Sequence, residues 1–164
     1  MAYDILFLCT GNSARSILAE ALASAPAVGL GRLRGHSAGS TPTGRVHPEA
    51  LATLDRHGIA LEEPASKSWD VFEGEGAPAI DFMITVCDNA AAEPCPVWPG
   101  RPATGHWGVP DPAAVTEPGE AQRAAFEAAF ETLRRRIHAF ASLPLATLDE
   151  AAIRAEAARI ARIA

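Results

Sequence analysis

A change of hydrophobic period within residues 1–26 constrains the fold more than any other feature. Residues 3–8 read YDILFL, a short and almost wholly apolar run that is typical of a strand buried on both faces. From Ser13 to Pro26 the apolar residues follow a helical spacing: Ala14, Ile17, Leu18, Ala21, Leu22 and Ala25. A buried strand, a tight polar loop and a helix in this order predict an α/β domain with a parallel sheet.

The rest of the chain continues this alternation. Further strands are predicted at 33–37, 80–86 and 103–107, and helices at 48–58 and 119–142. The longest helix carries an apolar stripe made of Phe126, Phe130, Leu133, Ile137 and Phe140. A capping box from Thr147 to Glu150 predicts a last helix with one apolar side: Ile153, Ala157, Ile160 and Ile163. We expect residues 1–142 to form the domain, and residues 143–164 to form a helical extension that packs on it or continues it.

Length and charge limit the classes of function. The chain has 164 residues, which suits one domain with a single core. Its net charge of −6 argues against nucleic acid or an anionic membrane as the main partner. No apolar run reaches the roughly 18 residues of a transmembrane helix, and the first residues lack the pattern of a signal peptide. The sequence therefore predicts a cytoplasmic protein.

The three cysteines are Cys9, Cys87 and Cys95. An odd, small number in a cytoplasmic chain does not indicate a disulfide framework, so these thiols are either reactive or simply buried. Cys9 and Cys87 each follow a predicted strand, and a parallel sheet would place both at the same rim. The five histidines show no metal-ligand spacing, so a zinc site is not expected.

The loop CTGNSARS, residues 9–16, has the composition of an anion cradle. Its backbone N–H groups and the start of the next helix can surround a tetrahedral oxyanion. Arg15 adds a two-pronged donor, and the same positive field favours the thiolate of Cys9, to which Ser16 can donate. The alternative is a buried strand cysteine and a solvated arginine. The predicted oxyanion-binding residues are Thr10, Gly11, Asn12, Ser13, Ala14, Arg15 and Ser16.

CTGNSARS resembles the active-site loop of the low-molecular-weight protein tyrosine phosphatase superfamily, and more narrowly that of the arsenate reductases built on this fold. Further matching motifs are SAGS at 37–40, VHPEA at 46–50, ITVCDNA at 84–90 and CPVWPGRPATGHWGVPDPA at 95–113. The resemblance covers about residues 3–142. It implies a three-layer fold with a four-stranded parallel sheet flanked by helices, to which this chain adds a C-terminal helix.

The resemblance to the reductases also implies roles for single residues. Cys9 is the nucleophile, Arg15 clamps the oxyanion, Cys87 is the second thiol, Cys95 is the resolving thiol, and Asp111 is the general acid. Arsenate would be reduced to arsenite, and thiol–disulfide exchange would pass the oxidised bond outward to thioredoxin or a similar reductant. Phosphate and sulfate are the expected competing anions. Seven residues separate Cys87 from Cys95, where about six are expected.

Two other functions stay open. A phosphatase would let water hydrolyse a cysteinyl phosphate, with Cys87 and Cys95 as bystanders or as redox protection. A non-catalytic module would use oxidation of Cys9 and Cys87 as a switch. Asp111 is followed by Ala113 and Ala114, and Tyr3 is the only tyrosine, which disfavours a pocket for phosphotyrosine.

No tightly bound cofactor is expected, and the one candidate ion is potassium beside the loop. Asn12, Glu20 and Ser37 match positions that hold potassium in some related reductases. The segment SKSWD, residues 66–70, departs from the pattern expected for the remaining ligands. The alternative is that Asn12 braces the loop and Glu20 is an exposed helix residue.

Overall fold

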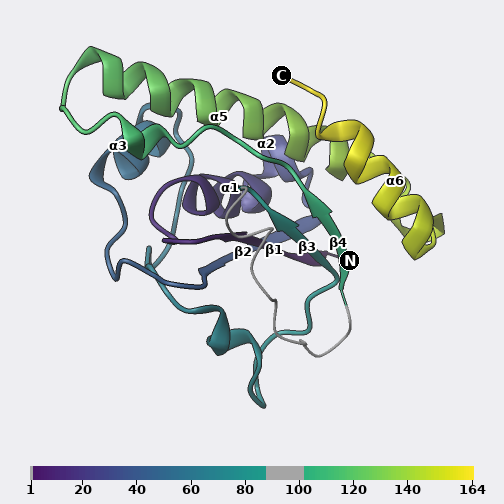
Figure 1. Ribbon diagram of the computed structural model, residues 1–164. Helices are drawn as coiled ribbons and strands as arrows, with labels where there is room; N and C mark the ends of the chain where they lie inside the picture. Colours follow the sequence, from purple (N-terminus) through teal and green to yellow (C-terminus); the bar gives the residue numbers. More distant parts are fainter. Residues whose placement is uncertain (1, 88–101) are drawn as a thin grey trace.

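A computed structural model describes residues 2–87 and 102–164 of the chain. At its centre lies a parallel sheet of four strands in the order β2-β1-β3-β4 (Figure 1). The strands are β1 (Tyr3–Cys9), β2 (Leu33–Gly39), β3 (Phe82–Thr85) and β4 (Ala103–His106). The predicted fold class is confirmed, and each predicted strand is present with both ends within two residues of the predicted positions.

Strand β1 is central and buried on both faces. Ile5 and Phe7 belong to the large core under the helices, whereas Leu6 and Leu8 belong to a smaller cluster on the opposite face. All four side chains are fully buried. Each contributes about 1.5–3 kcal/mol through its burial, so the strand holds the following residue, Cys9, in a fixed place at its end.

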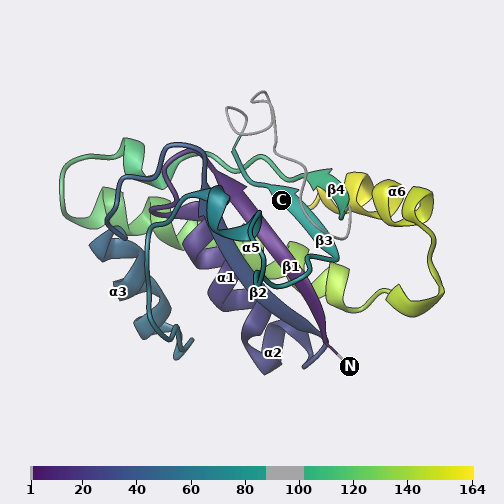
Figure 2. The ribbon, with the colours of Figure 1, turned by 90° about the horizontal axis from the view of Figure 1, so that it is seen from below.

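The described helices are α1 (Arg15–Ser24), α2 (Pro26–Gly29), α3 (Pro48–Arg56), α5 (Glu120–Ala141) and α6 (Glu150–Ile160). Figure 2 looks onto the sheet, with α1 and α5 behind it and the 3-10 helix η1 (Trp69–Phe72) in front. The predicted phenylalanine and leucine stripe of α5 is buried, so this helix covers one face of the sheet. Within residues 2–87 and 102–164, no helix is long and apolar enough to cross a membrane.

Three local predictions were wrong. The first helix begins at Arg15 rather than Ser13, which leaves Ser13 in the loop. A short helix, α2, follows Pro26, where the helical pattern was expected to stop. Thr147 does not cap α6: its hydroxyl donates to the carbonyl of Pro144, 2.9 Å away. Asp149 is the N-cap instead, and its carboxylate accepts the N–H of Ala152 at 2.8 Å.

Helix α6 packs against β4, at one edge of the sheet (Figure 1). The indole N–H of buried Trp107 donates to the carbonyl of Ala157 at 2.9 Å. A Cβ on Gly105 would lie 2.9 Å from the Cβ of Ala157, closer than carbon atoms of this kind approach. Glycine at position 105 therefore allows the close contact between helix and strand.

Candidate active site

The loop between β1 and α1 turns its carbonyl groups away from the centre of the cradle. The carbonyl of Thr10 accepts the N–H of Thr41, and that of Gly11 accepts the N–H of Thr43, both at 3.0 Å. In the described part of the chain, the N–H groups of residues 11–17 donate to no protein acceptor, and α1 has no side-chain cap. These donors and the start of α1 form the kind of nest that binds a tetrahedral oxyanion.

Cys9 ends β1 and is held by a short hydrogen-bond chain. Its sulfur lies 2.9 Å from the hydroxyl of Ser16, which is fully buried. The side-chain amide of Asn12 donates to the same hydroxyl at 2.8 Å. Because the Ser16 oxygen accepts from Asn12, its own proton can point at the sulfur of Cys9, where it would stabilise a thiolate.

Arg15 connects the loop to the segment that carries Asp111. One Nη of Arg15 donates to the carbonyl of Val109 at 2.9 Å, and the other lies 3.6 Å from Oδ2 of Asp111. The carboxylate of Asp111 also accepts the N–H of Ala113 at 3.0 Å, which fixes its direction. Asp111 is 45% exposed, so the ion pair adds little to the stability of the fold. Its effect is to position the carboxylate of Asp111 beside the anion cradle.

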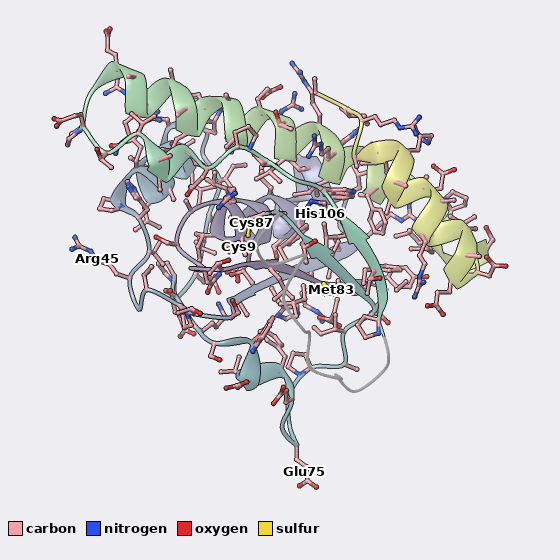
Figure 3. All side chains as sticks on the ribbon, viewed as in Figure 1. Cys9, Arg45, Glu75, Met83, Cys87 and His106 are labelled. Atoms are coloured by element: carbon pink, nitrogen blue, oxygen red, sulfur yellow. The ribbon has the colours of Figure 1, made fainter. Side chains whose placement is uncertain are left out.

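Cys87 lies at the same rim of the sheet, two residues beyond the end of β3 (Figure 3). The N–H of the preceding Val86 donates to the carbonyl of Leu8 at 2.9 Å, so the ends of β1 and β3 are joined there. The sulfur of Cys87 lies 3.7 Å from the hydroxyl of Thr10, the residue that follows Cys9. Cys9 and Cys87 are both buried. Cys95 lies outside the described residues.

The structure explains the glycine of the motif SAGS, Gly39, which the sequence pattern did not. A Cβ on Gly39 would lie 2.5 Å from the carbonyl oxygen of Thr10. Only glycine at position 39 therefore allows the end of β2 to lie this close to the loop. The N–H of Gly39 donates to the carbonyl of Lys67 at 2.9 Å, which brings the segment around Lys67 to the loop as well.

The three residues expected to hold potassium come together, but with a lysine among them. The hydroxyl of Ser37 donates to Oε1 of Glu20 at 2.8 Å, and Nζ of Lys67 lies 3.5 Å from the same oxygen. The side-chain oxygen of Asn12 accepts the backbone N–H of Lys67 at 2.8 Å. These residues do not suit a potassium ion, because an ammonium group already lies on Glu20 and the Asn12 oxygen is engaged. Among the described residues, no group of His, Cys, Asp and Glu is placed to hold another metal.

Sequence reasoning noted the segment 66–70 but gave no role to Ser66 or Lys67. The hydroxyl of Ser66 donates to the carbonyl of Gly11 at 3.0 Å, so both residues contact the anion-binding loop. One signal was available: Lys67 is the only lysine among the 14 Lys and Arg residues of the chain.

A cavity of about 700 Å³ opens beside the loop at Ser13. Arg45, His47 and Gln122 are among the side chains that line it. Figure 3 shows Arg45 projecting outward from this part of the molecule. The cavity offers space next to the anion cradle for a group larger than a free oxyanion.

The model of one protein family, low molecular weight phosphotyrosine protein phosphatase, matches residues 4–156. The arsenate reductase of Halalkalibacterium halodurans is 35% identical over 143 residues, which cover 84% of this chain and 94% of that protein. Arsenate reductase 1 of Staphylococcus epidermidis is 36% identical over 141 residues, with 81% and 96% covered.

Solved structures with the same fold include an arsenate reductase in its phosphate-binding state, with a TM-score of 0.62 and 25% identity. That alignment covers 82% of this chain and 96% of the other. A thioredoxin-dependent arsenate reductase of Corynebacterium glutamicum has a TM-score of 0.54 at 24% identity, over 81% of this chain and 59% of that one, and shows the shared fold. This chain therefore belongs to the low molecular weight phosphotyrosine protein phosphatase family.

Proposed function

We propose that this protein is an arsenate reductase, which converts arsenate to arsenite with electrons from its own thiols. The observation that carries the proposal is the second buried thiol, Cys87, which lies 3.7 Å from the hydroxyl of Thr10 and so adjoins the loop of Cys9. Hydrolysis of a phosphoester needs no thiol at that place. Relatives that carry the name arsenate reductase match more than four-fifths of this chain.

The first step is an attack on bound arsenate. The loop N–H groups and Arg15 hold the oxygens, and the sulfur of Cys9 forms a bond to arsenic(V). A hydroxide leaves from arsenic and takes a proton from Asp111, which enters this step as the neutral carboxylic acid and ends it as the carboxylate beside Arg15, so the leaving group departs as water. The outcome is an arsenic–sulfur bond on Cys9.

The second step is a transfer of electrons. The thiolate of Cys87 attacks the sulfur of Cys9, a disulfide forms, and the arsenic–sulfur bond breaks. The electron pair of that bond goes to arsenic, which leaves as arsenic(III) in arsenite. Two thiols are oxidised while one arsenic is reduced by two electrons, so the step is balanced.

The enzyme must then be reduced from outside. In the proposed relay, Cys95 attacks Cys87, which frees Cys9 for the next cycle, and a dithiol reductant of the thioredoxin class reduces the Cys87–Cys95 bond. The competing anions are phosphate and sulfate, since both are tetrahedral oxyanions. A cytoplasmic location of the protein, in which its thiols would be kept reduced, is a prediction from the sequence.

A residual phosphatase activity is a second candidate. Phosphoester hydrolysis would use the same groups as the first step of arsenate reduction: the anion cradle, Cys9 and the carboxyl group of Asp111. The cavity beside Ser13 has room for the leaving group of an aryl phosphate. We expect this activity to be low, since two alanines follow Pro112 where an aromatic substrate would need flanking rings.

A coupled assay tests the proposal. The protein is incubated with arsenate, thioredoxin, thioredoxin reductase and NADPH, and NADPH loss is followed. Cys87→Ser should abolish arsenate-dependent turnover yet keep hydrolysis of p-nitrophenyl phosphate, while Cys9→Ser should abolish both. Turnover of arsenate by the Cys87→Ser variant would contradict the proposal. Cys95→Ser tests the third thiol, and full activity in that variant would exclude the relay through Cys95.

A further inference from the structure

The single lysine of the chain lies beside the oxyanion loop. We propose that Lys67 is a positioning residue: its ammonium group serves as a built-in cation on Glu20, and its backbone N–H fixes Asn12, so that the loop keeps its anion-binding shape without a metal ion. The inference deepens the proposed function and rests on it only for the role of the loop in holding the substrate.

The first argument is the need of Glu20 for a positive charge. Its side chain is 14% exposed and lies under the loop end of β2. Oε1 of Glu20 accepts from the hydroxyl of Ser37 at 2.8 Å and lies 3.5 Å from Nζ of Lys67. A partly buried carboxylate is costly unless a charge partner and hydrogen bonds accompany it. The ammonium of Lys67, which also donates to the carbonyl of Ala65 at 3.3 Å, is that partner.

The second argument is the connection from Lys67 to the nucleophile. The backbone N–H of Lys67 donates to Oδ1 of Asn12, whose Nδ2 donates to Ser16, whose hydroxyl contacts the sulfur of Cys9. Asn12 is fully buried and has a φ of 44°, a left-handed conformation that asparagine adopts more readily than most other residues. The position of Lys67 is thus transmitted to Cys9 through two side chains.

The third argument is the choice of lysine in a chain that otherwise uses arginine. An ammonium is a compact point charge with three donors, whereas a guanidinium is a wide, planar fork. A potassium ion is also a compact single charge that binds oxygen atoms. A methionine at position 67 would remove the charge and leave the oxygens of Glu20 and Ala65 facing a small space. The inference therefore predicts that removal of the lysine charge creates a dependence on a small monovalent cation.

The experiment measures phosphate binding by isothermal titration calorimetry, in potassium chloride and in tetramethylammonium chloride at equal ionic strength. Wild type should bind phosphate equally in both salts. Lys67→Met should bind about 10-fold more weakly in tetramethylammonium and recover most of its affinity in potassium, as expected for coupled cation and anion sites. Arg154→Met removes one exposed positive charge far from the loop, and should behave as wild type.

Two results would overturn the inference: unchanged phosphate affinity of Lys67→Met in tetramethylammonium, or a loss that potassium does not reverse. A gain of affinity by wild type in potassium would overturn it as well. If Lys67→Met does not fold, Lys67→Ala, which also removes the charge and leaves the space open, is measured in the same two salts with the same Arg154→Met control. Because phosphate binding does not depend on arsenate turnover, failure of this test and failure of the coupled assay are separate outcomes.

Discussion

The hydroxyl oxygen of Ser16 lies 2.9 Å from the sulfur of Cys9 and accepts a hydrogen bond from the side chain of Asn12. This arrangement leaves the hydroxyl proton of Ser16 available to the sulfur. Its oxygen accepts from Asn12, and its proton can be donated to a thiolate form of Cys9, which cannot itself donate. Cys9 is thus supported by a residue from the first turn of α1 and by a residue of the loop.

Removal of this donor should slow the first chemical step. We expect Ser16→Ala to lower the rate of Cys9 alkylation by iodoacetamide about 10-fold at pH 7, since a hydrogen bond to a charged group contributes roughly 1.5–3 kcal/mol. The measurement uses a Cys87→Ser, Cys95→Ser background, in which Cys9 is the only cysteine. Ser142→Ala, at the far end of α5, is the control. An unchanged rate in Ser16→Ala would show that the contact has no part in thiolate formation.

The guanidinium of Arg15 should not be replaceable by an ammonium. Arg15 contacts Val109 and Asp111, and a guanidinium has five N–H donors in one plane, more than these two contacts need. A lysine has one charge centre and cannot serve both sides. We expect Arg15→Lys to weaken phosphate binding about 10- to 100-fold in calorimetry. Arg154→Lys should bind as wild type, and equal affinity in both variants would refute the clamp.

Because Gly105 and Ala157 lie in contact, substitutions at the two positions should have non-additive effects on the free energy of unfolding. Gly105→Ala places a methyl group 2.9 Å from that of Ala157, which we expect to cost about 1–3 kcal/mol of unfolding free energy. Ala157→Gly alone should cost about 1 kcal/mol, because glycine weakens a helix interior. The double variant should lose less than the sum of the two. Urea unfolding of the four proteins measures this, and strict additivity would mean that α6 does not press on β4.

Stability should fall in acid through Asp4. The guanidinium of Arg34 donates to the Asp4 carboxylate and, with His36, holds the pKa of Asp4 below its ordinary value of 3.8. A lowered folded-state pKa means that the stabilising effect is complete above pH 3.8 and is lost as pH falls through the folded-state value.

Asp4→Asn should therefore lower the unfolding free energy by at most about 1 kcal/mol at pH 7, because Arg34 is largely exposed and solvent screens the pair. The difference from wild type should shrink toward zero near pH 2. Thermal unfolding at both pH values checks this, with Asp55→Asn on the exposed face of α3 as the control. A difference that grows in acid would contradict the assigned sign.

The elements near the active site were predictable where the signal is local. The apolar run of β1 and the helical spacing of α1 lie next to each other in the chain, so a loop after Cys9 followed from the two periods, although it extends to Ala14 and not only to the residue before Ser13. The stripe of α5 was predictable for the same reason, since every third or fourth residue is large and apolar. The capping box predicted at Thr147 was wrong, because the hydroxyl of Thr147 donates to the carbonyl of Pro144 and Asp149 caps the helix instead.

What the sequence by itself determined is the strand, the loop and the helix that place Cys9 at an anion cradle, because consecutive residues build all three. Only the tertiary structure decided what surrounds the cradle. Asn12 and Lys67 meet across 55 positions of the chain, and Glu20 and Lys67 across 47. Such pairs depend on how β2 and the segment after it pack on β1, and no local period encodes that packing. In the folded chain, the ammonium group of Lys67, the only lysine, therefore lies beside Glu20, one of the residues that the resemblance assigned to potassium.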